Sequence, residues 1–289
     1  MPELPEVEVV RRSLDSLVCG LKIINVDILN NKLRYKIPKT IKSALKNTKI
    51  ISVRRRAKYL LIDTEDNNTL LIHLGMTGKI FILNKRKKLT IKTSFYYNSK
   101  ILHKHDHIKI ILGKYVELIY NDVRKFGFIK LLKTNLSKNN SNLSNLGPEP
   151  LSMNFNFKYL KTSCLKSKKN IKNFLMDQKY IAGLGNIYVN EILFKSSINP
   201  KKMTCSLKIL EIKNIVKNTK IILYDSIKKG GSSIKDFNDI SGKKGNFQQS
   251  FMVYDRESKD CMKKTCRSKI KKIYISNRST FFCNKCQNN

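Results

Sequence analysis

Apolar residues at the start of the chain recur at intervals of three and four positions. Val7, Val10, Leu14 and Leu17 fall on one stripe of a helix over PELPEVEVVRRSLDSLV. Acidic residues in its first turn and basic residues further along suit the helix dipole. The pattern predicts an amphipathic helix at the start of the fold.

Short apolar, β-branched runs replace this spacing between about Ile23 and Leu132. The runs are separated by polar, turn-like stretches and read IINVDIL, KIISV, YLLID, TLLIHLG, KIFIL, HIKIIL, YVELIY and FIKLL. Runs of this length and number predict an antiparallel β-sandwich or barrel.

Residues 133–150 are rich in Ser, Asn, Gly and Pro, a composition typical of an interdomain linker. Beyond them the apolar spacing is helical, and we expect helices near 156–164, 169–176, 186–194 and 206–228, with a short one near 233–237. The predicted fold class is α+β. Its expected parts are a helix and β-sandwich domain at 1–132, the linker, a helical domain at 151–240, a connection at 241–255 and a small module at 256–289.

The composition supports two packed domains, with 289 residues of which 41% are hydrophobic. Apolar runs long enough to cross a membrane are missing from the sequence. Glu3, Glu6 and Glu8 stand where a secretory signal needs basic and then apolar residues. We therefore expect a cytoplasmic protein with no membrane partner.

The charge is strongly positive, because 58 Lys and Arg residues face 21 Asp and Glu residues and give a formal net charge of +37. Such an excess attracts polyanions, so nucleic acid is the expected partner. Part of the excess reflects a general over-use of Lys, Asn and Ile, and those lysines would only solvate the surface. Charge alone favours DNA, RNA or ribosome binding without choosing among them.

Four of the seven cysteines crowd the end of the chain as Cys261-x4-Cys266-x16-Cys283-x2-Cys286. Paired thiolates suit tetrahedral zinc, and a module this short has no core without a metal. We expect one structural Zn²⁺ here. The other cysteines are isolated and are expected to be buried, and the odd total without a secretory signal argues against a disulfide framework.

Two short strands, IKKIYIS and RSTFF, lie between the cysteine pairs, with a turn near Asn277. This hairpin places Arg278 at or next to its tip, where an arginine can reach a phosphate. Taken alone, Arg278 is better explained as a solvated surface residue.

The N-terminus offers a nucleophile, because Met followed by Pro is normally processed and leaves a secondary amine at Pro2. An α-amino group titrates near about 7.7–8.0 and a lysine near about 10.4, so more of the former is free base at neutral pH. Such amines form Schiff bases with aldehydic carbons, and Glu3 beside it could act as acid or base. The competing interpretation is that Pro2 only starts a helix.

A set of separated motifs bears on this choice. These are PELPEVEVVRR, RRAKYLL, HLGMTGK, KHDH, LGPEPL, FLMDQKYIAGLGNIYVNEILF, GGSSIKDF and RSTFFCNKCQ. In order and over essentially the whole chain, they resemble the bacterial formamidopyrimidine-DNA glycosylase family. The resemblance implies an N-terminal helix with a β-sandwich, then a helix-two-turns-helix domain and a zinc hairpin, with DNA bound between the two parts.

The resemblance also implies catalytic roles. Pro2 matches the Schiff-base nucleophile and Glu3 the acid or base that aids base departure and sugar-ring opening. Lys58 matches a lysine implicated in β-elimination, and Arg278 an arginine that aids δ-elimination. Without the resemblance, Lys58 would be interpreted as an exposed basic residue at a strand end.

Other matched residues are expected to bind DNA. A glycosylase must flip the nucleotide out of the stack and fill the vacancy, and Met76, Arg124 and Phe126 match the family's wedge residues. Phosphate contacts are expected from His73, His105, Lys168 and Asn186, with Arg278 as a further candidate. Met76 and Phe126 alone would more often be core residues. The lesion-recognition loop is expected within 241–251.

The implied activity is a DNA glycosylase and abasic-site lyase that removes oxidised purines from double-stranded DNA, working as a monomer. Two alternatives remain open: an endonuclease VIII-like glycosylase for oxidised pyrimidines, and a non-catalytic basic zinc protein that binds nucleic acid. Two motifs depart from the family. The first cysteine pair is spaced by four residues where two are usual, and DVRKFG replaces the commoner DPRRFG. These departures bear on efficiency and base preference more than on reaction type.

Overall fold

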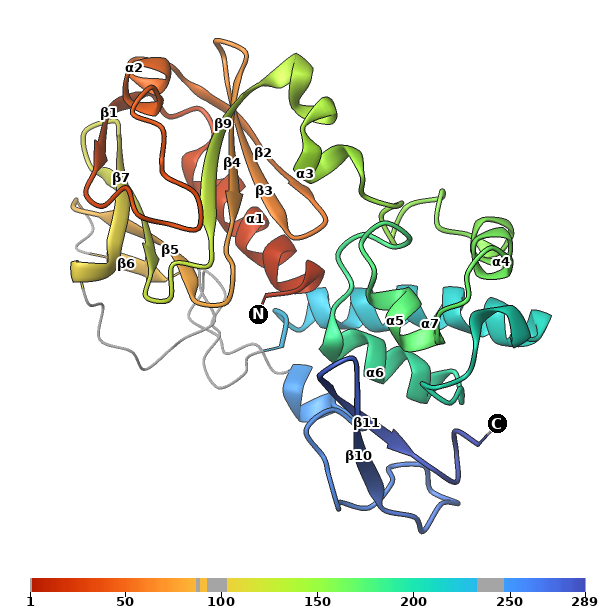
Figure 1. Cartoon of the computed structure of the whole chain (residues 1–289). Coiled ribbons are helices and arrows are strands. Elements are labelled where there is room, and N and C mark those ends of the chain that lie inside the picture. The colour runs from red at the N-terminus through yellow and green to blue at the C-terminus, as the bar shows by residue number, and fades with distance from the viewer. Residues whose placement is uncertain (1, 87–88, 93–102, 233–246, 289) are drawn as a thin grey trace. The chain divides into compact units, whose positions relative to one another are not determined.

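The computed structural model describes residues 2–86, 89–92, 103–232 and 247–288. These residues form two compact units (Figure 1). The first comprises the described residues within 1–144 and 229–246, and the second those within 145–228 and 247–289. The predicted helix near 233–237 and residues 241–246 of the predicted lesion-recognition loop lie outside the described residues.

The first unit begins with helix α1 (Leu4–Val18), which buries Val7, Val10 and Leu14 of the predicted stripe and leaves Leu17 half-buried. Two antiparallel sheets follow. One has the order β1-β7-β8-β5-β6 and the other β2-β3-β4-β9. The strands are β1 (Ile23–Ile28), β2 (Ile50–Arg56), β3 (Tyr59–Thr64), β4 (Asn68–His73), β5 (Gly78–Asn84), β6 (Leu89–Lys92), β7 (Asp106–Leu112), β8 (Val116–Asp122) and β9 (Phe128–Lys133).

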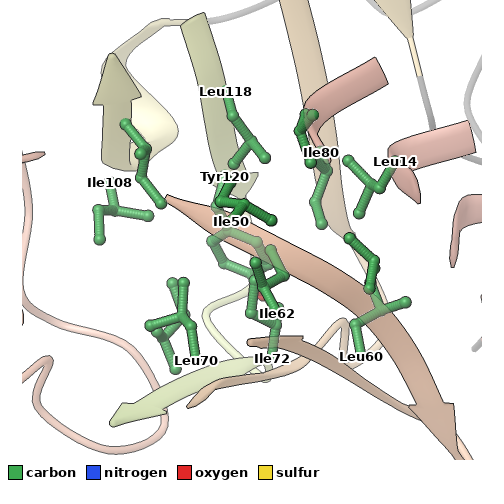
Figure 2. Close-up of a cluster of buried hydrophobic side chains, with 14 of the residues drawn as sticks. Leu14, Ile50, Leu60, Ile62, Leu70, Ile72, Ile80, Ile108, Leu118 and Tyr120 are labelled. Atoms are coloured by element: carbon green, nitrogen blue, oxygen red, sulfur yellow. The ribbon is translucent and has the colours of Figure 1, made fainter. Parts of the chain in front are cut away.

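One apolar cluster joins α1 to both sheets, as Figure 2 shows for Leu14, Ile62 and Leu118. Burying this apolar surface from water is the main force that holds the two sheets face to face. The structure confirms the predicted sandwich and all eight predicted strands. It adds β6 and a short helix, α2 (Ile41–Leu45), which were not predicted.

The segment after β9 contains a 3₁₀ helix, η2 (Thr134–Asn139), and a short helix, α3 (Ser141–Ser144). Lys130 Nζ donates to Asn142 Oδ1 at 2.6 Å and holds this part against the sheet of the first unit. Further along, the amide of Gly147 donates to the carbonyl of Gln178 at 2.8 Å, within the second unit. The predicted linker is therefore packed at both ends rather than extended through solvent.

The second unit contains α4 (Phe157–Leu165), α5 (Ile171–Met176), α6 (Asn186–Lys195) and α7 (Ile209–Lys228), with 3₁₀ helices η3 (Thr204–Ser206) and η4 (Phe247–Ser250). Residues 187–194 of α6 are all buried, so α6 is the central helix of this unit. Of the three isolated cysteines that were expected to be buried, Cys164 is buried and Cys19 is half-buried. Cys205 is exposed, because its short helix η3 lies at the surface.

A two-stranded hairpin, β10 (Ile270–Ile275) and β11 (Arg278–Cys283), packs against α6. The amide of Phe281 donates to Asn190 Oδ1 at 2.8 Å, and Gln287 Nε2 donates to the carbonyl of Ile198 at 2.9 Å. The buried carboxylate of Glu191 accepts hydrogen bonds from the amides of 252–254. The first of these bonds joins β11 to α6, the second joins the chain after the hairpin to the segment after α6, and the Glu191 bonds join the segment before the hairpin to α6. Among the residues that the structure describes, none of the helices is long and apolar enough to cross a membrane.

Candidate functional site

The start of α1 is held in a fixed conformation. Pro2 is buried and directly precedes Glu3, the N-cap residue, which is 3% exposed. Glu6 Oε2 accepts from the amide of Glu3 at 2.8 Å, as in a capping box. An amine at Pro2 would therefore sit at the positive end of a helix dipole, which disfavours its protonation and keeps it nucleophilic.

The second carboxylate oxygen of Glu6 binds a distant segment of the same unit. Glu6 Oε1 accepts from the amide of Ser232 at 2.8 Å and from its hydroxyl at 2.7 Å. Gly231 has a φ of +84°, and a Cβ there would lie 3.3 Å from Glu6 Cγ. The Gly-Gly pair of the GGSSIKDF motif permits this approach. Glu6 was not predicted as a site residue, although it lies in the PELPEVEVVRR motif.

Lys58 lies in the turn between β2 and β3, after Ala57, whose φ is +52°. It is only 8% exposed, so it is not the exposed strand-end residue of the competing interpretation. Arg55, on the same hairpin, donates to Glu8 Oε2 at 3.0 Å and to the carbonyl of Ala57 at 3.0 Å. These bonds join α1 to the turn that carries Lys58.

Glu8 is a charged anchor for this connection. Burial pushes its pKa up, but the hydrogen bond and charge of Arg55, with the charge of Arg11, outweigh burial and hold the pKa of Glu8 below its usual value. The carboxylate therefore stays ionised at neutral pH.

His73 ends β4 and faces the ring of Phe128, with centroids 5.2 Å apart and 18° between the planes. Burial, with the charges of Lys58 and Arg34, lowers its pKa to about 4. Nδ1 accepts from the amide of Gly75 at 3.1 Å, which leaves the proton of the neutral ring on Nε2. His73 can thus donate to a phosphate as a neutral group.

The three predicted wedge residues lie on two adjacent loops of the first unit. Arg124 and Phe126 are exposed, and the Arg124 guanidinium lies 4.6 Å from the Phe126 ring centre. Met76 is half-buried on the other loop, and the amide of Arg124 donates to Thr77 Oγ1 at 3.1 Å. Neither apolar side chain is a core residue. Half-exposed His105 directly precedes β7, the neighbour of β8 in the sheet.

Arg278 is exposed and directly follows the two-residue turn of the hairpin, Ser276-Asn277, in which both φ angles are positive. Lys172, fully buried on α5, donates to the carbonyl of Ser279 at 3.0 Å. The predicted position of Arg278 next to the tip is confirmed, and a buried lysine that was not predicted holds that tip.

Asn186, the first residue of α6, donates through Nδ2 to the same carbonyl of Ser279 at 3.0 Å. The structure thus brings Asn186 and Arg278 close together, at a helix start where an anion is favoured. Lys168 is exposed in the loop between α4 and α5.

The four C-terminal cysteines converge, with all four Sγ atoms within 4.8 Å of one another. Cys261 and Cys286 are 3.8 Å apart, and Cys266 and Cys283 are 3.6 Å apart. Zinc bound at about 2.3 Å by four sulfurs has a tetrahedron edge of about 3.8 Å. The thiols therefore fit a tetrahedral metal in spite of the x4 spacing.

These features define a class of protein: a helix-capped β-sandwich followed by a helix-two-turns-helix unit with a four-cysteine hairpin. The sequence profile of the formamidopyrimidine-DNA glycosylase N-terminal domain matches residues 1–129, and that of the formamidopyrimidine-DNA glycosylase H2TH domain matches 146–238. The chain belongs to the formamidopyrimidine-DNA glycosylase family.

Relatives match over the full length. The formamidopyrimidine-DNA glycosylase of Rickettsia bellii is 41% identical over 99% of both chains, and that of Dinoroseobacter shibae is 38% identical over 99% of this chain and all of the relative. The Lactococcus lactis enzyme bound to DNA with an abasic site is 34% identical, with a TM-score of 0.86 over 99% of this chain and all of the other. MutM bound to DNA with carbocyclic 8-oxoguanine has a TM-score of 0.85 at 34% identity, with complete coverage of both chains.

Proposed function

We propose that this protein is a DNA glycosylase and abasic-site lyase that removes oxidised purines, namely 8-oxoguanine and formamidopyrimidines, from double-stranded DNA. Membership of the family along the whole chain carries the proposal. The DNA in solved complexes of its relatives, with abasic sites, formamidopyrimidine and 8-oxoguanine, supports the choice of substrate.

Pro2 is the proposed nucleophile, after removal of Met1. Its amine attacks C1′ of the flipped nucleotide, the bond from C1′ to the base breaks, and the base leaves with a proton. Glu3 supplies that proton or protonates the ring oxygen as the sugar opens to the Schiff base. The buried, fixed start of α1 supports these roles, because a positioned amine and acid need no reorganisation.

The Schiff base acidifies C2′, and loss of a proton there expels the 3′ phosphate. Lys58 is the proposed aid to this β-elimination, and Arg278 aids the δ-elimination that expels the 5′ phosphate. Met76, Arg124 and Phe126 fill the space of the flipped nucleotide, and His73, His105, Lys168 and Asn186 bind phosphates. The exposure of Phe126 and Arg278 and the burial of Lys58 are consistent with these roles.

One zinc ion bound by Cys261, Cys266, Cys283 and Cys286 is the proposed structural metal. It would hold the hairpin that carries Arg278, with no part in the chemistry. We also propose that the protein acts as a monomer on DNA in the cytoplasm, and that 1–132, 151–240 and 256–289 are its functional domains, joined by 133–150 and 241–255.

A comparison of two duplexes tests the proposed activity. The protein should cut DNA with 8-oxoguanine opposite C faster than DNA with thymine glycol. Preferential cutting of thymine glycol would identify an endonuclease VIII-like enzyme. Tight, salt-sensitive DNA binding without any cutting would identify a non-catalytic binder.

A further inference from the structure

The two loops that carry the proposed wedge residues meet at one buried carboxylate. We call residues 74–77, between β4 and β5, the Met76 loop, and residues 123–127, between β8 and β9, the Phe126 loop. Asp122 ends β8, directly before the Phe126 loop, and is 0% exposed.

The Asp122 carboxylate binds both loops. Oδ1 accepts from the Thr77 hydroxyl at 2.5 Å, and Oδ2 accepts from the amide of Gly127 at 2.8 Å. The Tyr120 hydroxyl lies 3.4 Å from Oδ2 and 3.3 Å from the carbonyl of His73, just before the Met76 loop. The two contacts of Oδ2, with the Gly127 amide and the Tyr120 hydroxyl, are buried, and a hydrogen bond counts for more when it is shielded from water.

The backbone of Asp122 is fixed as well. Its carbonyl oxygen lies 3.0 Å from Nε2 of His107, which is fully buried, and the opposite ring nitrogen lies 3.1 Å from the carbonyl of Asn30. The carboxylate therefore has little freedom to follow either loop.

The loops also touch through their backbones. A Cβ on Gly75 would lie 2.4 Å from the amide nitrogen of Gly127, and a Cβ on Gly127 would lie 1.8 Å from the Tyr120 hydroxyl. Thr77 completes the link, since its hydroxyl donates to Asp122 and accepts from the amide of Arg124 at 3.1 Å. A shift of one loop must therefore displace the other.

We propose that Asp122 is a positioning residue for lesion extrusion, which sets the spacing of Met76 from Arg124 and Phe126 so that all three enter the duplex as one rigid unit. The inference rests on the wedge role under the proposed function. It concerns a residue that contacts no DNA and acts only through Thr77 and Gly127. A carboxylate suits this task, because both partners donate and it accepts at both oxygens.

The test compares Asp122→Asn with Thr77→Val. An asparagine that accepts from the Gly127 amide can only donate to the Thr77 hydroxyl, so that bond is reversed and the two loops no longer donate to one carboxylate. Valine keeps the shape of threonine and removes the hydroxyl alone. Asp63→Asn is the matched control. Asp63 is a 3% exposed carboxylate of the same unit that accepts from Arg54, Ser52 and Thr69, away from both loops.

Two readouts separate positioning from folding. Fluorescence of 2-aminopurine opposite a tetrahydrofuran abasic analogue reports wedge insertion, and strand cutting at an abasic site in single-stranded DNA reports the chemistry without a stack to open. For Asp122→Asn and Thr77→Val we expect a smaller fluorescence change and a fall of about tenfold or more in kcat for 8-oxoguanine excision. Single-stranded cutting should be unchanged in both variants. Asp63→Asn should match wild type in the fluorescence change, in kcat for 8-oxoguanine excision and in single-stranded cutting, once the values are corrected for stability.

The outcomes are distinguishable. If wild type excises 8-oxoguanine and both loop variants behave as Asp63→Asn does, Asp122 is only a structural residue and the inference is wrong. The inference is also overturned if single-stranded cutting falls as much as duplex excision. A wild type that neither cuts nor changes the fluorescence overturns the proposed function itself.

Discussion

His73 shows how strongly the fold changes one side chain. Its ring is largely buried and faces the ring of Phe128. This burial, with the charges of Lys58 and Arg34, lowers its pKa to about 4 from 6.5. The sequence suggested a phosphate contact, and a charged imidazolium would be the usual expectation for one. The structure instead provides a neutral donor, so phosphate contact through His73 should not weaken as the pH rises through 6.5.

The lowered pKa of His73 predicts a pH-dependent stability. The unfolded chain takes up a proton as pH falls from 6.5 toward about 4, whereas the folded chain does not, so stability is complete above this window and is lost as pH falls through it. His73→Asn keeps an acceptor for the amide of Gly75 and removes the titration. Between about pH 7 and pH 5, its urea midpoint should fall less than that of wild type. Parallel losses in the two proteins would show that His73 is not the titrating group.

At the scale of elements, α1 and the β2–β3 hairpin are joined by a shared ion pair. Glu8 accepts from Arg55 of the hairpin at 3.0 Å and also from Arg12 of its own helix at 3.0 Å. The side chain of Arg55 is 10% exposed, whereas that of Arg12 is 59% exposed. Of these two pairs, the one with Arg55 connects the helix that follows Pro2 to the hairpin whose turn carries Lys58.

This difference predicts unequal effects for two arginine substitutions. Arg55→Gln should lower the free energy of unfolding by about 1–3 kcal/mol, because a charged hydrogen bond to a partly buried carboxylate is lost. It should also slow Schiff-base formation more than it weakens DNA binding. Arg12→Gln, the matched control, should cost less than about 1 kcal/mol. If denaturant unfolding showed the same loss of unfolding free energy for both variants, the ion pair of Arg55 with Glu8 would not be the stronger of the two.

The cysteine hairpin predicts a dependence on metal. One zinc per chain is expected by metal analysis, and Cys283→Ser should lose it and loosen the turn before Arg278, which weakens nicking. The fit of the four sulfur atoms to a tetrahedron supports this expectation. A purified protein that cuts DNA normally with no bound metal would exclude the zinc role and leave the hairpin held by α6 alone.

At the scale of the whole molecule, the net charge of +37 predicts strong electrostatic attachment to DNA. Release of counterions from about six to ten phosphate contacts would lower affinity by about 10³–10⁵ between 50 and 200 mM salt. Titration of a fluorescent duplex over this range measures the slope. A nearly flat dependence would mean that most of the basic residues only solvate the surface.

The sequence predicted most of the architecture, because apolar spacing marks buried faces directly. The eight strands and the principal described helices follow it, whereas β6 was missed because its strand is short and lies among lysines. The exposure of Phe126 and the burial of Lys58 had no local signal. They follow from the close approach of Gly75 to Gly127 and from the turn at Ala57, which only the folded chain provides. The roles of these residues stay predictions.

The amine of Pro2 is the central claim, and borohydride trapping tests it most directly. Wild type incubated with 8-oxoguanine DNA and borohydride should form a covalent adduct that peptide mapping places on Pro2. A chain with extra residues ahead of Pro2 should form none, yet still bind duplex with a tetrahydrofuran abasic analogue. Equal trapping of the extended chain, or an adduct on a lysine such as Lys58, would contradict the account.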